Sequence, residues 1–522
     1  MELLGRSIIG SKRGETGGAV LHGFNPATSE TLQPAYHSAT SAEVDRAAQL
    51  ANAAFSSYSQ TTGAQRGSFL RQIAKNIEAL GDTLILRATQ ETGLAEARIR
   101  TETTRTCNQL RLFADLVEEG SWVDARIDHG DPNRTPIPKP DIRSLLRPLG
   151  PVVVFGASNF PLAFSVAGGD TASALAAGNP VIVKAHHAHP GTSELVGLAV
   201  ADAVRQCDLH EGVFSLLYGS GSEIGTALVR HPLIKAGGFT GSRAGGRALF
   251  DAASSRPEPI PFYAEMSSVN PVVILPEALS VRTDQIATGL HASVTLGAGQ
   301  FCTNPGLVFL PSNSDAFVQK LSELMAATPD QTMLTPGIRS SYEKGVLGRG
   351  DQAGVATVMK RSAESDCAAG TVLFRITTEQ YLANAALSEE IFGPTTLIVT
   401  YETEEQLLAL ARSLEGQLTA TIHGSESELA AHEELLSVLE TKAGRLLFDG
   451  FPTGVEVCHA MVHGGPYPAT SDGRSTSVGT RAIFRFTRQV CFQSFPDSAL
   501  PEELKEENPL EIWRLVDGKV GR

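Results

Sequence analysis

The sequence has too few cysteines, placed too far apart, for a disulfide scaffold or a cysteine-bound zinc. Six cysteines stand among 522 residues, and no two of them have C-x-x-C spacing. No apolar run approaches the roughly 18 residues of a membrane helix, and residues 1–10 lack the apolar core of a signal peptide. We therefore expect a cytoplasmic protein with reduced thiols, no membrane partner and no metal.

Basic residues are also in the minority. The chain has 43 Lys and Arg against 57 Asp and Glu, which gives a formal charge of -14. Proteins that bind nucleic acid usually present a basic surface, so nucleic acid is excluded as the main partner and a small molecule is expected. The apolar content of 42% and the length fit two or three packed domains.

Short apolar runs alternate with helix-like stretches over most of the chain. A first series lies at 152–155, 181–183, 213–217 and 235–239, and a second at 271–275, 307–310, 395–399, 418–422 and 445–448. This alternation predicts an α/β protein with parallel sheets. Parallel sheets bind ligands at the carboxyl ends of their strands, so the residues that follow these runs are where we expect the chemistry.

Cys302 is the first candidate because of its neighbours. Small residues precede it at 297–299, and Pro305-Gly306 marks a turn just after it. A cysteine at a helix end, beside exposed backbone amides, can be held as a thiolate and attack a carbonyl carbon. The alternative, and the commoner role of a lone cysteine, is a small buried hydrophobe.

Two further residues have the chemistry that such a cysteine needs. Glu265 ends an apolar stretch, where burial would raise its pKa and suit it to act as a general base. Asn159 follows the first buried run, and its amide could complete an oxyanion hole with the backbone N–H of the cysteine. The alternatives are an exposed edge-strand glutamate and an ordinary turn asparagine.

Cofactor signals are weaker, since the chain has no G-x-G-x-x-G motif. Residues 239–246 read FTGSRAGG, which is typical of a strand, a tight turn and the start of a helix. Glycines there let a phosphate approach the backbone and the helix N-terminus. Lys184 follows another apolar run and could bind ribose hydroxyls or phosphate; the alternative is a solvated lysine.

Taken together, six motifs occur in the order and spacing of the aldehyde dehydrogenase superfamily. They are FGASNFP at 155–161, VIVK at 181–184, FTGSRAGG at 239–246, the Glu265 segment, GQFCT at 299–303 and EEIFGP at 389–394. The chain resembles this superfamily from about residue 24 to 493. The resemblance implies a Rossmann-type cofactor domain, an α/β catalytic domain and a small β oligomerisation element.

The resemblance also implies the role of each site residue. It makes Cys302 the nucleophile, Glu265 the base that activates the deacylating water, and Asn159 the oxyanion donor. For a nicotinamide dinucleotide it implies the following residues: Lys184 at a ribose, Gly241, Ser242 and Gly246 at the pyrophosphate, Glu390 at the nicotinamide ribose and Phe392 near the nicotinamide.

A domain layout follows from the same resemblance. Residues 1–124 and 149–262 would form the cofactor-binding domain, and 263–470 the catalytic domain. Residues 125–148 and 471–495 would form the oligomerisation element of a homodimer or homotetramer, followed by a C-terminal tail at 496–522.

The chain departs from the common family pattern at several positions. Ser158 precedes Asn159 where the family often has tryptophan, and Met266-Ser267-Ser268 replaces Leu-Gly-Gly. His187 stands where many members have a glutamate that repels a 2′-phosphate. Losing this carboxylate removes the repulsion, so we expect NADP or NAD as cofactor, with NADP favoured. The alternatives for the nearby histidines are a surface turn and, much less favoured, a metal site.

These departures resemble one branch of the superfamily, the 2-oxoglutaric semialdehyde (2,5-dioxopentanoate) dehydrogenases, with a bacterial fatty aldehyde dehydrogenase as a near relative. A dicarboxylate semialdehyde needs a cation in the substrate tunnel, and Arg111 and His463 are the candidates. Phe160 and Phe164 would line an apolar wall. For Arg111 the alternative is a solvated helix arginine.

Three hypotheses about function remain open from the sequence. The first is NAD(P)-dependent oxidation of 2-oxoglutaric semialdehyde to 2-oxoglutarate through a cysteine thiohemiacetal and thioester. The second is oxidation of a fatty or general aliphatic aldehyde. The third is a binding protein that keeps the fold without activity, against which the presence of Cys302, Glu265 and Asn159 argues.

Overall fold

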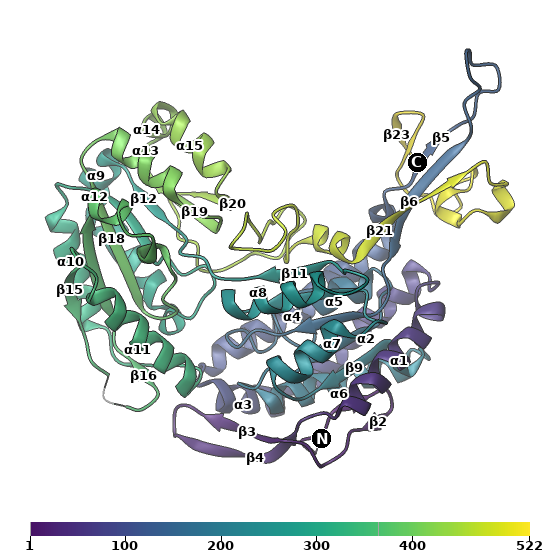
Figure 1. Ribbon diagram of the computed structural model, residues 1–522, viewed down its shortest axis with the longest axis horizontal. Helices are drawn as coiled ribbons and strands as arrows, with labels where there is room; N and C mark the ends of the chain where they lie inside the picture. Colours follow the sequence, from purple (N-terminus) through teal and green to yellow (C-terminus); the bar gives the residue numbers. More distant parts are fainter. Residues whose placement is uncertain (1, 364) are drawn as a thin grey trace.

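The computed structural model describes residues 2–363 and 365–522. Within them the chain forms two seven-stranded sheets, each covered by helices, and a projecting arm built on a five-stranded sheet. Figure 1 shows the lobe of the second sheet on the left and the arm, with the C-terminus, at the upper right. The predicted α/β class is confirmed.

The first sheet has the strand order β11-β10-β7-β8-β9-β1-β2. Its strands are β1 (Ile8–Ile9), β2 (Lys12–Arg13), β7 (Val152–Phe155), β8 (Val181–Lys184), β9 (Phe214–Leu217), β10 (Ala236–Thr240) and β11 (Phe262–Glu265). The strands from β11 to β9 are parallel, and the antiparallel pair β1 and β2 extends the far edge. The four apolar runs predicted as the first series of strands are confirmed.

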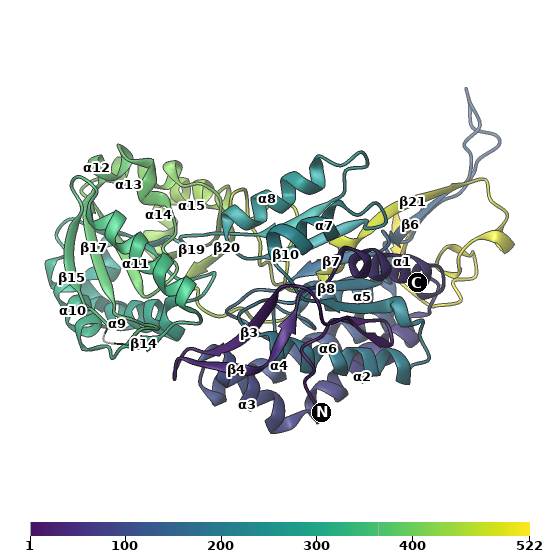
Figure 2. The same ribbon diagram turned by 60° about the horizontal axis from the view of Figure 1, so that its bottom comes forward.

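Helices cover both faces of this sheet (Figure 2). Alternate strand residues pack against one or the other layer, because successive side chains of a strand point to opposite faces. One layer contains α5 (Gly169–Ala176) and α6 (Pro190–Gln206), with α2 (Gly63–Ala79), α3 (Gly81–Thr92) and α4 (Glu96–Glu119) beyond them. The other contains α1 (Ser41–Tyr58), α7 (Thr226–Arg230) and α8 (Arg243–Ser254). A hairpin of β3 (Val20–Asn25) and β4 (Glu30–His37) lies beside α3.

The second sheet has the order β15-β17-β18-β13-β12-β19-β20, in which β15 runs antiparallel to its neighbour and the other strands are parallel. Its strands are β12 (Val272–Ile274), β13 (Leu307–Pro311), β15 (Ala356–Lys360), β17 (Val372–Thr377), β18 (Thr395–Tyr401), β19 (Gln417–His423) and β20 (Ala443–Phe448). The helices of this lobe are α9 (Pro276–Thr295), α10 (Asp315–Ala327), α11 (Pro336–Gly350), α12 (Thr378–Leu382), α13 (Glu404–Ser413), α14 (Glu426–Ala431) and α15 (Glu433–Glu440). The second series of predicted strands is confirmed, whereas β15 and β17 were not predicted.

Short elements complete the description. A small two-stranded sheet pairs β14 (Gln331–Thr332) with β16 (Ala368–Ala369). The short helical turns are η1 (Ser121–Val123), η2 (Glu211–Val213), η3 (Gly221–Gly225), η4 (Leu296–Gly299), η5 (Ala385–Ser388), η6 (Thr480–Phe486), η7 (Asp497–Ala499) and η8 (Glu502–Leu504).

The arm corrects the expectation of a separate C-terminal tail. Its sheet has the order β21-β6-β5-β22-β23, formed by β5 (Arg126–Asp128), β6 (Ile142–Pro148), β21 (Thr487–Gln493), β22 (Arg514–Val516) and β23 (Lys519–Gly521). Residues 496–522 thus belong to the arm. Arg143 of β6 fixes them there, donating to the carbonyl of Leu504 at 2.7 Å and pairing with Glu506 at 3.1 Å.

Two other expected domain boundaries also differ from those in the structure. Glu265 ends the last strand of the first sheet, so the cofactor-domain sheet reaches beyond residue 262. The segment 471–486, expected in the oligomerisation element, packs on the first lobe instead. Asn179 donates to the carbonyl of Phe486 at 3.0 Å, and Arg485 pairs with Asp170 at 2.6 Å.

Among the described residues, no helix is both long enough and apolar enough to cross a lipid bilayer.

Candidate active site

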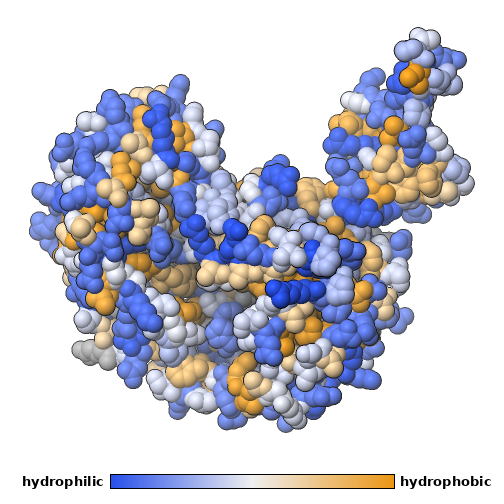
Figure 3. Space-filling view, in the orientation of Figure 1, coloured by the Kyte–Doolittle hydropathy of each residue, from blue (hydrophilic) through white to orange (hydrophobic). Residues whose placement is uncertain are grey.

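The site lies where the carboxyl ends of the first sheet face the amino ends of the second. Asn159 follows β7, Lys184 ends β8 and Glu265 ends β11. Cys302 comes from the opposite direction, on the loop that leads into β13. The space-filling view is hollowed where the two lobes meet (Figure 3). The sheet edge at which the sequence predicted chemistry is therefore the edge that forms the site.

An unusual backbone presents the sulfur of Cys302. Gly297, Ala298 and Gly299 all have left-handed φ angles, of 57°, 58° and 64°. This conformation is strained for Ala298 and easy for the glycines. A Cβ on Gly299 would overlap the backbone of Gly393, so the small residues noted in the sequence are required by close packing.

Asn270 anchors the loop that carries Cys302. Its side-chain amide donates to the carbonyls of Cys302 and Asn304, both at 2.9 Å. Asn270 itself has φ 47°, a conformation that asparagine tolerates better than most residues. The side-chain oxygen of Gln417, at the start of β19, accepts from the backbone of Asn270 at 3.1 Å and from the hydroxyl of Ser268 at 2.9 Å. The serine that departs from the family pattern is thus part of this anchor.

Cys302, His463 and Glu265 form one cluster, in which His463 and Glu265 are buried and Cys302 is partly buried. The Sγ of Cys302 lies 3.5 Å from Nε2 of His463, and that nitrogen lies 2.9 Å from Oε1 of Glu265. A ligand atom from each of the three residues lies within 4.8 Å of the other two. The hydroxyl of Ser477 donates to Oε2 of Glu265 at 2.6 Å. The sequence placed His463 at the substrate, and the structure places it between the thiol and the carboxylate.

The electrostatics of this cluster correct two expectations. Burial alone would raise the pKa of Glu265, but the close approach of His463 and the hydrogen bond from Ser477 outweigh it and lower the pKa. Burial, together with the negative charges of Glu265 and Glu390, raises the pKa of Cys302 well above its ordinary value. The sequence predicted a raised carboxyl pKa and a thiolate. The pKa directions instead favour a protonated Cys302 beside an ionised Glu265.

Asn159 lies next to the Cys302 loop and is itself held from several sides. Its Nδ2 donates to the carbonyl of Gln300 at 3.0 Å, and its own carbonyl accepts from Arg98 at 2.8 Å. The buried carboxylate of Glu102 accepts the backbone N–H groups of Leu162 and Ala163 at 2.9 and 3.0 Å. One face of α4 therefore fixes the turn that carries the asparagine.

Phenylalanine rings line one side of the site. The rings of Phe160 and Phe164 have centroids 5.3 Å apart, and those of Phe160 and Phe301 5.4 Å. Phe164 in turn lies 6.0 Å from the ring of His463. The aromatic wall predicted from Phe160 and Phe164 thus stands next to the cluster, and it includes Phe301 as well.

Arg111 is not brought to this wall. Its guanidinium pairs with Glu78 at 2.7 Å on the outer side of the α2–α4 pair, and the side chain is 38% exposed. Arg98 and Arg105 are the α4 arginines that reach the aromatic rings, at 5.0 Å from Phe160 and 5.2 Å from Phe164. These two are about two helical turns apart and share a helix face, whereas Arg111 lies about 120° further round. The heptad spacing could have revealed them in the sequence.

Most of the residues expected at the adenine end of a dinucleotide line one cleft of about 420 Å³, whereas Gly246 lies behind it against Met266. Its lining includes Lys184, His187, Gly241 and Ser242. Ser242 caps α8 by accepting the N–H of Gly245, and a Cβ on Gly246 would overlap the side chain of Met266. The glycines thus permit the tight turn at the N-terminus of a helix of 12 residues. This cradle fits a pyrophosphate, because helix N-termini favour anions.

The surroundings of this cleft lower the pKa of its basic side chains. Burial lowers the pKa of Lys184 to about 8. Partial desolvation, together with the charge of Lys184, lowers the pKa of His187, whose ring stacks on that of His186 at 4.4 Å. His189 is buried and contacts the carbonyl of Ala157 through Nε2 at 2.9 Å. The three histidines are therefore neutral near pH 7, and His189 supports the turn that leads to Asn159.

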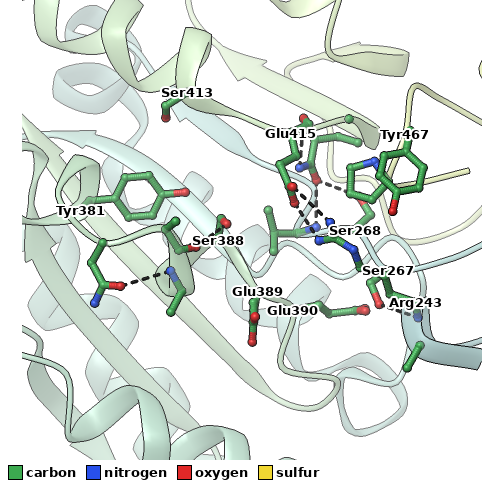
Figure 4. Close-up of a pocket in the computed structure, with 18 of the residues that line it drawn as sticks. Arg243, Ser267, Ser268, Tyr381, Ser388, Glu389, Glu390, Ser413, Glu415 and Tyr467 are labelled. Carbon is green, nitrogen blue, oxygen red and sulfur yellow. Dashed lines mark hydrogen bonds and ion pairs between the residues drawn. The ribbon is translucent and has the colours of Figure 1, made fainter. Parts of the chain in front are cut away.

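A second cleft, of about 860 Å³, runs between the lobes and contains Glu390 (Figure 4). In the close-up the carboxylate of Glu390 points toward Ser267. Burial raises the pKa of Glu390 to about 7. Phe392 lies two residues further along, next to Gly393, whose carbonyl accepts from Asn304 at 3.2 Å. The loop of Glu390 and Phe392 thus packs on the loop of Cys302.

The fold and the site fit one class of protein, an α/β enzyme in which a cysteine lies between two lobes and a helix N-terminus opens on a neighbouring cleft. The sequence pattern of the aldehyde dehydrogenase family matches residues 14–448. The chain belongs to the aldehyde dehydrogenase family.

Two curated relatives match the whole chain. The chain is 52% identical to "Alpha-ketoglutaric semialdehyde dehydrogenase 2" of Azospirillum brasilense, with 100% of both chains covered. It is 47% identical to "Alpha-ketoglutaric semialdehyde dehydrogenase" of Acinetobacter baylyi, with 98% of both covered.

Solved structures resemble the fold at lower identity. Betaine aldehyde dehydrogenase from Staphylococcus aureus, in complex with NAD+, has a TM-score of 0.80 and 20% identity, over 95% of this chain and 96% of that one. A cysteine-to-alanine variant of Aldehyde Dehydrogenase C from Pseudomonas syringae, in complex with NAD+ and octanal, has a TM-score of 0.79 and 21% identity, over 95% and 98%. At these identities the likeness concerns the fold alone.

The conformation of the Cys302 loop gives a stability prediction. Gly299→Ala should lower the free energy of unfolding by about 2 kcal/mol, because the new Cβ overlaps the Gly393 backbone at a left-handed φ of 64°. Gly348→Ala is the matched control, since it lies in α11 with open space around it and should change stability by less than about 1 kcal/mol. Chemical denaturation measures both, and equal stabilities for the two variants would contradict this account of the loop.

Proposed function

We propose that this enzyme oxidises 2-oxoglutaric semialdehyde to 2-oxoglutarate through a thiohemiacetal and a thioester on Cys302. The observation that carries the proposal is the 52% and 47% identity, over essentially the whole chain, to two enzymes named for this aldehyde. The cluster of Cys302, His463 and Glu265 supports it, because it contains a nucleophile and a proton acceptor in contact.

The first chemical step is addition of Sγ to the aldehyde carbon. Because the pKa of Cys302 is raised, its proton leaves as the bond forms rather than beforehand. His463, with Nε2 3.5 Å from the sulfur, receives the proton or passes it to Glu265. Asn159, with a second N–H beyond the one it gives to Gln300, donates to the oxyanion together with the backbone N–H of Cys302.

The thiohemiacetal becomes a thioester once it has lost a hydride and the proton of its oxygen, and the remaining step is hydrolysis of that thioester. The lowered pKa of Glu265 favours the ionised form near neutral pH, so a proton received from Cys302 is released to solvent before Glu265 takes a proton from the attacking water. The hydrogen bond from Ser477 holds one carboxylate oxygen, which leaves the other toward His463 and the sulfur. The hydroxide equivalent then attacks the thioester carbon, Sγ leaves and the acid is released.

A nicotinamide dinucleotide, when bound, supplies the hydride acceptor for this oxidation. Lys184, Gly241, Ser242 and Gly246 would hold its adenine half in the smaller cleft, and Glu390 and Phe392 its nicotinamide half. Among the described residues that line the smaller cleft, none is Asp or Glu, and His187 lies there in neutral form. We therefore propose that NADP is accepted along with NAD, and favoured.

The alternative substrate is a fatty or general aliphatic aldehyde. The aromatic wall of Phe160, Phe164 and Phe301 is what favours it, because such rings bind alkyl chains through apolar contact. The two substrate classes differ in one charge, so a panel of aldehydes separates them.

The panel consists of 2-oxoglutaric semialdehyde, succinic semialdehyde and hexanal, each assayed with NAD and with NADP. We expect kcat/KM for 2-oxoglutaric semialdehyde to exceed that for hexanal by at least about tenfold, and NADP to be used at least as well as NAD. Hexanal as the best substrate would contradict the proposed function, and failure to use NADP would contradict the cofactor proposal.

The pKa of about 7 for Glu390 predicts a pH dependence of cofactor binding. An ionised carboxylate accepts two ribose hydroxyls better than a protonated one, so KM for the cofactor should rise about threefold or more as the pH falls from about 8 to about 6. Glu390→Gln should have a raised KM that no longer depends on pH in this range. Glu389→Gln, a change at the exposed neighbouring carboxylate, should behave like the unmodified enzyme. If the unmodified enzyme and both variants had the same pH dependence, the titrating group would not be Glu390.

We further propose that the arm joins copies of this chain into a homodimer or homotetramer. It projects from the body of the molecule (Figure 1) and exposes large apolar side chains. Ile137, Phe495 and Val520 are 68%, 50% and 72% exposed. Surfaces of this kind commonly mark interfaces between subunits.

A further inference from the structure

Several arginines lie around the reacting thiol, and they differ in how many of their N–H groups already have hydrogen-bond partners. Arg98 lies over the rings of Phe160 and Phe301, at 5.0 and 4.7 Å, and donates to the carbonyl of Asn159. Arg445 donates through both terminal nitrogens, to the carbonyls of Gly454 at 3.2 Å and Pro452 at 2.8 Å, and only its buried Nε has no partner among the described residues. Both side chains therefore hold backbone in place.

Arg105 has donors to spare. Its Nη1 is buried and has no hydrogen-bond partner among the described residues. Its Nη2 makes one long contact, 3.4 Å, to the carbonyl of Val455. A buried guanidinium that lacks partners is costly, since its N–H groups have given up water without replacement. An anionic ligand is the partner that would satisfy it.

A series of neighbouring contacts connects Arg105 to the thiol of Cys302 by way of Phe164 and His463. Its guanidinium lies 5.2 Å from the ring of Phe164, that ring lies 6.0 Å from the imidazole of His463, and the imidazole lies 3.5 Å from Sγ. A short chain running along Phe164 would thus have its aldehyde at the thiol and its far end at Arg105. Burial lowers the pKa of Arg105. The carboxylate of Glu102 is the largest of the charges that act to raise it, followed by Cys302, Glu456 and Glu265, so the guanidinium lies within the electrostatic field of the cluster.

Gly454, the neighbour of Val455, places no side chain near this end of the site. Gly454 has φ 105°, and a Cβ built on it would meet no described atom within 4 Å. The stretch 452–455 is held by Arg445 on one side and contacted by Arg105 on the other. An open space bordered by a charged side chain with free donors can accept a carboxylate.

We infer that Arg105 binds the carboxylate of the substrate, and so selects aldehydes that carry an anionic group about four carbon–carbon bonds from the reacting carbon. The inference rests on the proposed function, in which the substrate is 2-oxoglutaric semialdehyde. It assigns to Arg105 the recognition that the sequence assigned to Arg111. The aromatic wall then contacts the methylene groups of the same substrate, and Arg98 and Arg445 position the backbone around it.

The test compares three aldehydes of equal carbon count: 2-oxoglutaric semialdehyde, glutaric semialdehyde and pentanal. Glutaric semialdehyde keeps the carboxylate without the keto oxygen, and pentanal lacks both. The variants are Arg105→Gln, Arg105→Lys and the matched control Arg111→Gln, which lies on the same helix but pairs with Glu78 at the surface. The readout is the ratio of kcat/KM for each charged aldehyde to that for pentanal, with KM for the cofactor and the melting temperature as checks on folding.

We expect Arg105→Gln to lower this ratio by about 10- to 100-fold for both charged aldehydes. Arg105→Lys should lower the ratio less than Arg105→Gln does, because lysine keeps the positive charge and loses only the planar guanidinium. Arg111→Gln should leave it unchanged. If Arg105→Gln does not fold, Arg105→Lys carries the test, since it keeps the charge and most of the buried stem.

The ways in which the inference can fail are distinguishable. If the unmodified enzyme prefers pentanal, the proposed function and this inference both fall. If it prefers the charged aldehydes and the Arg105 variants keep the same ratio, or lose all three aldehydes equally, the proposed function stands and the assignment of Arg105 is wrong.

Discussion

The site is arranged around one buried negative charge, the carboxylate of Glu265. That carboxylate ends the edge strand β11 and is 4% exposed, so it needs partners to remain ionised. His463 and Ser477 supply them, at 2.9 and 2.6 Å, and the same imidazole reaches the sulfur of Cys302. Two lobes contribute to this contact, because Glu265 comes from the first sheet and Cys302 from the second.

The geometry around this charge depends on backbone that few sequences could adopt. Left-handed residues at 297–299 turn the chain so that Cys302 faces the first lobe, and Asn270 ties the turn to the start of β19 through Gln417. On the other side, α4 holds the Asn159 turn through Arg98 and Glu102. Helix α4 thus supports the Asn159 turn and, through Arg98 and Arg105, packs on the aromatic wall along one face.

Much of this arrangement was predictable from the sequence. The parallel strands follow from short apolar runs, and the convergence of Asn159, Glu265 and Cys302 was expected from the family resemblance. The rest depends on contacts between distant residues. Glu265 was expected to have a raised pKa, and the approach of His463, which comes from a loop near the other end of the chain, reverses that direction. Arg111 was expected at the substrate, but it pairs with Glu78 at the surface, and the sequence did not show which face of α4 packs on the aromatic wall. The strands of the tail are too short to show a period.

In the proposed mechanism the sulfur of Cys302 carries the acyl group until Glu265 activates water to release it. Mass spectrometry of a Glu265→Gln variant mixed with cofactor and 2-oxoglutaric semialdehyde tests this step, with Cys302→Ala as control. We expect an acyl adduct on the peptide that contains Cys302, accumulating in Glu265→Gln and absent from Cys302→Ala. No adduct under conditions of cofactor reduction, or an adduct on another residue, would contradict it.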